Sequence, residues 1–144
     1  MQRINYGKIA PKAIKLLLEM EGYKKETDLE ESLIHLVKIR ASQLNQCAFC
    51  IDMHTKEARE AGETEQRIYC LSAWREANIY SPKERAALQL TEAVTFIAKT
   101  GVSDSVYEEA RNHFNEKQTI DLIFIIITIN SWNRLSIANR NVVQ

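Results

Sequence analysis

The fold is decided by residues 36–54, LVKIRASQLNQCAFCIDMH, which carry two helical patterns that meet at Asn45. Before Asn45, apolar residues between positions 29 and 44 recur near helical spacing, which predicts an amphipathic helix. Asparagine often caps a helix N-terminus and glycine often follows a helix C-terminus, so we expect a further helix from Asn45 to Gly62. The stretch therefore predicts two helices joined by a short turn.

Similar start and stop signals recur along the rest of the chain. The clearest is Ser81-Pro82-Lys83-Glu84, which combines an N-cap residue, a proline at the first helical position and a glutamate that completes a capping box. Asp28 followed by Glu31 is typical of the same box. The chain has only four glycines and two prolines, so we predict an all-α domain of about six to seven helices. The ranges expected to be helical are 11–21, 28–44, 45–62, 64–74, 81–100, a short segment from 103, and 115–137.

Length and composition describe one ordinary domain. The chain has 144 residues and a mass of 16.6 kDa, so we expect a single domain over residues 1–144. Nineteen basic residues balance nineteen acidic ones and are scattered among them, which argues against a nucleic-acid partner. We find no signal-peptide pattern, and the longest apolar stretch, 122–129, is too short to cross a bilayer. We therefore expect a cytoplasmic protein that makes no membrane contact.

The segment from Ile120 to Ile129 is rich in β-branched residues, and propensity alone would make it a strand. We predict a helix instead, because the segment follows a capping signal at Asn115 and its apolar residues continue at helical spacing through Trp132 and Leu135. A helix that is apolar on nearly every side needs a cover on every side. We therefore expect a subunit interface along this helix.

Cys47, Cys50 and His54 are the residues that point to chemistry. Their spacing of three and then four residues places all three side chains on one helix face. The cysteines fall in the first turn of the expected helix, where the dipole and the free N–H groups favour thiolate over thiol. One turn later, an imidazole can take a thiol proton directly or through a water molecule. We interpret the three residues as a dithiol redox centre in which one cysteine attacks an oxidant and the other resolves the product.

A zinc site is the chemical alternative. Cys47, Cys50 and His54 would supply three ligands and His35 a fourth, but the chain has no second CxxC or HxxxH pair of the kind that structural zinc sites use. We favour the redox interpretation and expect neither a metal nor a cofactor. His35 either borders the core or joins the proton relay, and the spacing alone leaves both interpretations open.

Residues 36–54 also resemble the core of the AhpD-like alkylhydroperoxidases, which belong to the carboxymuconolactone decarboxylase superfamily. The similarity continues through residues 55–59, 65–67, 73–76, 81–85 and 129–134, so it covers most of the chain between about positions 30 and 140. It implies the AhpD-like all-α fold. Small single-domain members of the family commonly form trimers or hexamers, which implies a homo-oligomer and agrees with the apolar last helix.

The resemblance implies a role for each matching residue. Cys50 corresponds to the peroxidatic cysteine, which attacks a hydroperoxide and becomes a sulfenic acid. Cys47 corresponds to the resolving cysteine, which condenses with it to a disulfide, and His54 matches the histidine that relays protons to the thiols. In well-known members a lipoylated carrier protein reduces the disulfide. The expected partners are therefore a hydroperoxide substrate and an external dithiol reductant.

Two positions depart from the family pattern. The family commonly has a glutamate of the relay twelve residues before the first cysteine, where this chain has His35, whose imidazole can also accept a proton near neutral pH. The peroxidase members carry a histidine directly before the second cysteine, where this chain has Phe49. The alternative hypothesis is therefore a redox-sensing or binding module that changes its oligomer interface without turnover. Lactone decarboxylation is not expected, because those members do not rely on the CxxC pair.

Overall fold

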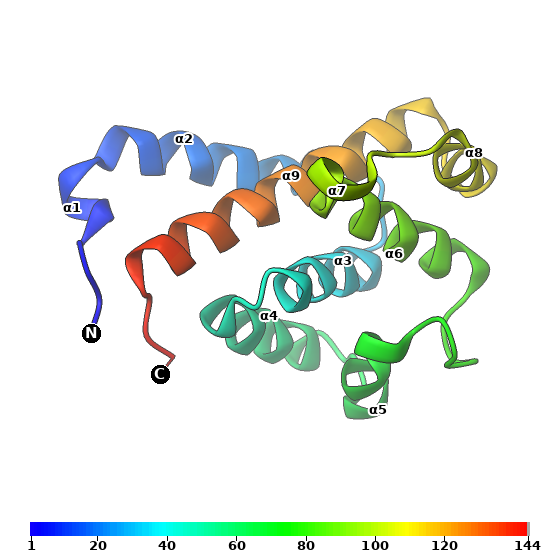
Figure 1. Ribbon diagram of the computed structural model, residues 1–144, viewed down its shortest axis with the longest axis horizontal. Helices are drawn as coiled ribbons and strands as arrows, with labels where there is room; N and C mark the ends of the chain where they lie inside the picture. The colour runs from blue at the N-terminus through cyan, green and yellow to red at the C-terminus, as the bar shows by residue number, and fades with distance from the viewer. Residues whose placement is uncertain (144) are drawn as a thin grey trace.

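The computed structural model describes residues 1–143, and this part of the chain is helical with no strand (Figure 1). The all-α prediction is confirmed, with nine α-helices rather than the six to seven expected. The elements are α1 (Tyr6–Ile9), α2 (Pro11–Gly22), the 3-10 turn η1 (Tyr23–Glu26), α3 (Glu31–Leu44), α4 (Ala48–Glu60), α5 (Glu65–Tyr69), the 3-10 turn η2 (Cys70–Ala73), α6 (Pro82–Thr95), α7 (Ile97–Thr100), α8 (Asp104–His113) and α9 (Glu116–Asn139).

Helix α3 lies at the centre of the bundle, in contact with α4, α6 and α9 (Figure 1). It is buried on two sides because each side joins a different apolar cluster. The first cluster connects α3 to α6, α8 and α9 through residues that include Leu33, Val37, Leu90, Phe114 and Ile126. The second connects α3 to α4, α6 and the α5–η2 segment through residues that include Leu36, Ile39, Ala58, Leu71 and Leu88. This double burial holds the C-terminal end of α3, and with it the turn into α4, in one position.

Two capping boxes confirm predicted helix starts. The Ser81 hydroxyl accepts a hydrogen bond from the backbone N–H of Glu84, and the Glu84 carboxylate accepts one from the N–H of Ser81. Asn115 and Gln118 form the same reciprocal pair at the start of α9. Each box satisfies two backbone groups that a helix N-terminus otherwise leaves without partners.

Two other predicted starts are wrong. Helix α3 begins at Glu31 after an N-cap, Glu30, whose side chain makes no capping bond, and Asp28 instead accepts a hydrogen bond from Gln118 at 3.3 Å. Helix α4 begins at Ala48 with Cys47 as its N-cap, so Asn45 ends α3 rather than starting α4. In both cases the predicted cap is outside the helix it was expected to start.

Some boundaries inside predicted helices also differ. Gly22 is the last residue of α2 rather than the residue after it, and its right-handed backbone leads directly into η1. The range 64–74 divides into α5 and η2, and the range 81–100 divides at Phe96, where the backbone leaves helical geometry between α6 and α7. The short helix α1 was not predicted.

Helix α9 confirms the helix prediction for the β-branched segment. It is long and apolar enough to cross a membrane by length and composition alone, and half of that window is buried inside the structure. Its outer side exposes Ile120, Phe124, Ile127 and Ile137. These residues fit the expected subunit interface, which stays a prediction.

The two ends of the chain meet beside α9 (Figure 1). The backbone N–H of Arg3 donates to the carbonyl of Asn139 at 2.9 Å, and the Asn141 amide donates to the Tyr6 hydroxyl at 2.7 Å. Helix α2 also contacts α9. These contacts place α1 and α2 near the N-terminal end of α4, where they form one wall of the site described next.

Candidate active site

The turn between α3 and α4 presents Cys47 at the start of a helix. Gln46 adopts a left-handed backbone with φ of 56°, which lets the chain reverse direction within two residues. The N–H of Cys47 then donates to the carbonyl of Ser42 at 3.0 Å, across the turn. The turn therefore fixes where the first cysteine begins α4.

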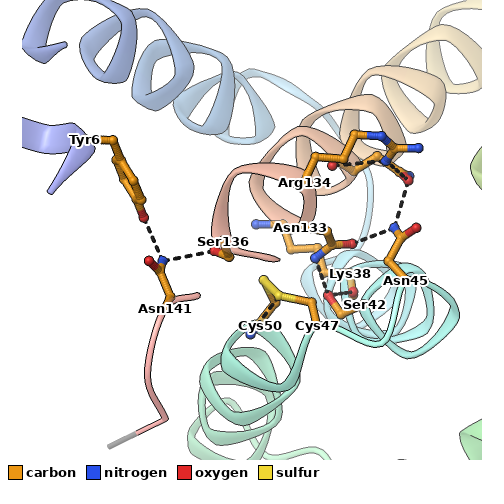
Figure 2. The surroundings of a disulfide bond; sticks show 11 residues. Tyr6, Lys38, Ser42, Asn45, Cys47, Cys50, Asn133, Arg134, Ser136 and Asn141 are labelled. Carbon is orange, nitrogen blue, oxygen red and sulfur yellow. Dashed lines mark hydrogen bonds between the residues drawn. A yellow bond between two sulfur atoms is a disulfide. The ribbon is translucent and has the colours of Figure 1, made fainter. Parts of the chain in front are cut away.

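Side-chain amides from α9 hold this turn in place (Figure 2). The Asn45 amide donates to the side-chain oxygens of Asn130 and Asn133, both at 2.9 Å, and the Asn133 amide donates to the Ser42 hydroxyl at 3.0 Å. Asn133 is fully buried. Buried amides of this kind cost stability unless they are paired, so the network specifies one position of the turn against α9.

Cys47 and Cys50 form a disulfide bond, with their Cα atoms 5.3 Å apart (Figure 2). Both are almost completely buried, at 2% and 1% exposure. The backbone N–H of Cys50 points at the Cys47 sulfur at 3.4 Å, so Cys47 takes the place of the oxygen of an ordinary N-cap. A helix N-terminus stabilises negative charge, and this contact favours Cys47 as a thiolate whenever the disulfide opens.

His54 lies one turn after Cys50 on α4 and is 4% exposed. Its Nδ1 atom is 3.0 Å from the Glu57 carboxylate, an acceptor, so Nδ1 carries the hydrogen and Nε2 is left as the basic nitrogen. Nε2 is buried and has no hydrogen-bond partner within residues 1–143. Burial is the main cause that lowers the pKa of His54 below its usual value, with Lys38 adding to it and Glu57 opposing it. A neutral imidazole with an unoccupied nitrogen is ready to accept a proton.

A cavity of about 400 Å³ lies against Cys50 and His54. Its walls come from α1, α2, η1, α4 and α9, and most of them are apolar. Among the described residues Cys47 is not part of its lining, so Cys50 is the sulfur that a molecule in the cavity would meet first. The lining also includes Tyr6, Leu18, Glu21, Lys24, Phe49, Met53, Glu57, Trp132 and Ser136.

The structure thus brings Cys47, Cys50 and His54 together, as their spacing on one helix face predicts. It does not bring His35 to the same cavity. His35 lines a separate cavity of about 340 Å³ with η1 and α3 residues such as Lys25. Its two ring nitrogens lack hydrogen-bond partners among the described residues, and Nε2 is 3.6 Å from the Glu31 carboxylate.

The zinc alternative loses its fourth ligand in this arrangement. His35 was the candidate to complete a set with Cys47, Cys50 and His54, and it lies away from their cavity. Within residues 1–143 no group of three or more His, Cys, Asp and Glu side chains is arranged to hold a metal ion.

Sequence reasoning missed Glu21, an ionisable residue in the wall of the cavity. Glu21 is at the end of α2, and its carboxylate pairs with Lys38 of α3 and, at 3.1 Å, with Lys24 of η1. No local pattern marks this residue, because it reaches the cavity of Cys50 only when α2 packs against α9 and Glu21 pairs with Lys38 of α3.

Known proteins with similar sequences and structures agree with this fold. A model of the carboxymuconolactone decarboxylase family matches residues 11–93. The uncharacterised protein YdfG of Bacillus subtilis is 53% identical over 140 residues, which span 97% of this chain and 95% of YdfG.

Two solved structures extend the comparison. ATU0492 from Agrobacterium tumefaciens, described as a protein of unknown function and a candidate antioxidant defence protein AhpD, is 43% identical with a TM-score of 0.97, covering 100% of this chain and 99% of that one. A peroxidase-related protein with an alkylhydroperoxidase AhpD core from Ralstonia eutropha JMP134 shares the fold at 18% identity, with a TM-score of 0.83 over 96% of this chain and 74% of that one.

Proposed function

The chain belongs to the carboxymuconolactone decarboxylase family and has its AhpD-like fold, and from this we propose that it is a thiol-dependent peroxidase. It would reduce hydroperoxides at the Cys47–Cys50 centre with electrons from an external dithiol. The observation that carries this proposal is the arrangement of the three residues: Cys50 and His54 face one cavity, and Cys47 lies directly behind Cys50. A sulfur that meets the substrate, a base beside it and a second sulfur within bonding distance are the parts that such a cycle needs.

In the oxidative half of the cycle, neutral His54 takes the proton of the Cys50 thiol through its free Nε2. The Cys50 thiolate attacks the terminal oxygen of the hydroperoxide, the O–O bond breaks, and the alkoxide leaves with the proton from His54 as an alcohol. Cys50 is then a sulfenic acid. The Cys47 thiol attacks its sulfur, water leaves, and the disulfide forms. Two electrons have moved from the two thiols to the peroxide.

The reductive half starts from the disulfide state of the structure. A donor thiolate enters the cavity and attacks the Cys50 sulfur, which breaks the disulfide and releases Cys47 as a thiolate. The N–H of Cys50, which points at the Cys47 sulfur, stabilises this leaving group. The second donor thiol then attacks the donor sulfur of the mixed disulfide and frees Cys50. The donor leaves as a cyclic disulfide, and both cysteines are reduced again.

The cavity walls favour an organic hydroperoxide over hydrogen peroxide. Apolar surface surrounds the reactive sulfur and comes from Tyr6, Leu18, Phe49, Met53 and Trp132. The alkyl or aryl group of an organic hydroperoxide would remove this surface from water, which favours its binding. The same surface suits the hydrocarbon arm of a lipoyl group, so we propose a lipoylated carrier protein as the dithiol donor. We further propose that the protein acts in the cytoplasm as a homo-oligomer, a trimer or a hexamer.

Trapping of the sulfenic acid tests the proposal. Reduced Cys47→Ser protein, which lacks the resolving thiol, is treated with one equivalent of cumene hydroperoxide and then with dimedone. We expect intact mass and peptide mapping to find one dimedone adduct, on Cys50. The matched control is Cys50→Ser, in which Cys47 should stay unmodified under the same conditions. The proposed roles would be contradicted by an adduct on Cys70 or by no adduct in Cys47→Ser, or by an adduct on Cys47 in Cys50→Ser.

A redox switch without turnover is the second candidate function. The exposed apolar residues of α9 support it, because such residues suit a contact between subunits on which a switch could act. Under this hypothesis the oligomer mass, measured by light scattering, differs between the reduced and the oxidised protein. An unchanged mass counts against the switch and leaves the peroxidase.

A further inference from the structure

Glu21, in the wall of the cavity against Cys50, forms an ion pair with Lys38 that the proposed cycle does not use. Glu21 lines this cavity together with Cys50 and His54. Its carboxylate oxygen Oε1 contacts Lys38 Nζ directly, and the same oxygen accepts a hydrogen bond from Lys24 at 3.1 Å. The Lys38 side chain is only 3% exposed, and that of Glu21 is 22% exposed.

A buried ion pair of this kind adds little to stability. Removing two charges from water costs about as much as their attraction returns, and apolar residues of similar size often serve a fold better. An apolar side chain would fit at position 38, because most of the α3 residues around Lys38 are buried and apolar. Charged groups that are held inside a protein beside a cavity are concentrated at functional sites. The position of Glu21, in the wall of the same cavity as Cys50, therefore calls for a functional explanation.

The pair acts on His54 through its charge. The charged and titratable groups around the His54 imidazole are Glu57 on α4, Glu21 on α2, Lys24 on η1, Lys38 on α3 and Tyr6 on α1. The α9 side of the cavity contributes Trp132 and Ser136, which carry no charge. After burial and the Glu57 hydrogen bond, Lys38 is the next influence and lowers the pKa of His54, whereas Glu21 raises it.

Glu21 is ionised and negatively charged beside the cavity. Burial opposes its ionisation, but Lys38 and then Lys24 outweigh burial, so the pKa of the Glu21 carboxyl lies below its usual range. Glu57, which touches His54 directly, is 45% exposed and therefore more strongly screened by water. Glu21 and Lys38 are thus the charges at this centre that solvent screens least.

We propose that Glu21 and Lys38 are positioning residues of the dithiol centre with opposed effects. Each charge on its own changes how readily Cys50 releases a proton and His54 takes it up, and in the wild type the two charges largely balance. The carboxylate favours the imidazolium that forms when His54 accepts the proton, and the buried ammonium favours the thiolate that the proton leaves. This inference rests on the proposed function, since it assigns a purpose to proton transfer between these two residues. It deepens that function by adding residues from α2 and α3 to a centre otherwise built on α4.

The test measures protonation rather than peroxide turnover. His54 is titrated by NMR of its ring protons in the oxidised protein, with its signal assigned by its loss in His54→Gln. Cys50 is followed by the pH profile of iodoacetamide alkylation in a reduced background that carries Cys47→Ser and Cys70→Ser. Glu21→Gln is expected to move both midpoints down by about half a pH unit or more, because a nearby negative charge is lost.

Lys38→Met is expected to move both midpoints up by a similar amount, because it removes the positive charge and leaves Glu21 paired with Lys24. The double variant Glu21→Gln/Lys38→Met should return close to the wild type. The matched control is Glu30→Gln/Lys83→Met, which removes an exposed ion pair with a 3.1 Å contact and should leave both midpoints unchanged.

Unchanged midpoints, or shifts of the same sign in Glu21→Gln and Lys38→Met, would overturn the proposal, because altered packing has no reason to follow the sign of the charge. Glu21→Gln leaves the buried Lys38 ammonium without its partner, which could prevent folding. In that case Lys38→Met alone, compared with the double variant, still tests the proposal, because neither of them leaves Lys38 unpaired. Failure of the proposed function is a separate result: a wild-type protein that consumes no peroxide would still titrate, and the shifts in these variants would still be measurable.

Discussion

Replacing Asn133 with leucine is expected to loosen the turn that places Cys47. The Asn133 side chain accepts from the Asn45 amide at 2.9 Å and donates to the Ser42 hydroxyl at 3.0 Å, and it is fully buried. Leucine has a similar volume and removes both hydrogen bonds. At about 1 kcal/mol for each bond, the free energy of unfolding should fall by about 2 kcal/mol. The loss is not larger because Asn45 keeps its bond to Asn130 and Ser42 still donates to the Lys38 carbonyl.

Urea denaturation of the oxidised protein measures this loss, and a thermal melt should show a midpoint lower by roughly 4–8 °C. In the reduced protein, disulfide closure after one equivalent of hydroperoxide should also be slower, because Cys47 no longer starts from a fixed position. The matched control is Asn112→Leu, since Asn112 is exposed and its side-chain amide donates to Glu109 at 3.3 Å. A loss in Asn133→Leu no larger than in this control would refute the assignment of the network to the turn.

Three further results are expected. His54→Gln should slow peroxide reduction by about 10²-fold or more, the usual loss when a general base is removed, as measured by steady-state kinetics. His35→Glu should leave that rate within about twofold of the wild type, because His35 lines a different cavity; a large gain would place it in the relay. Because burial lowers the pKa of His54 in the folded protein, the unfolded state binds more protons below about pH 6.5, so stability should fall as the pH drops through that range and level off below the folded pKa. Urea midpoints between pH 8 and 4.5 test this, and His54→Gln should flatten the slope.

The grouping of Cys47, Cys50 and His54 could be predicted from the sequence because it is local. Cys47, Cys50 and His54 lie within eight residues of one another, and helical geometry alone brings residues three and four apart to one face. The capping boxes at Ser81 and Asn115 could be predicted in the same way, since each box is made by residues three apart in the chain. A local pattern suffices when the partners are neighbours in sequence.

Asn45 shows where a local pattern fails. Its residue type favours a helix N-cap, but its amide is used for hydrogen bonds to Asn130 and Asn133 of α9, more than 80 residues away. The sulfur of Cys47 caps α4 instead. Long-range packing overrode the preference of Asn45, and that packing is invisible until α9 is placed.

Glu21 and His35 show the same limit for the functional site. His35 is closer to Cys47 in sequence, yet α3 directs it to another cavity, whereas Glu21 reaches the cavity of Cys50 from the end of α2. Sequence spacing could not separate them, because the outcome depends on how α2 and α3 each pack against α9. The charged surroundings of the dithiol are therefore a property of the tertiary structure.

The most direct test of the account is turnover. Wild-type protein and Cys50→Ser are mixed with an organic hydroperoxide and dihydrolipoamide, and peroxide loss is followed over many equivalents of protein. The account predicts continuous loss with the wild type and, with Cys50→Ser, no loss above the rate of the donor alone. Wild-type oxidation that stops after one equivalent, or equal rates in the two proteins, would contradict a peroxidase that works through Cys50.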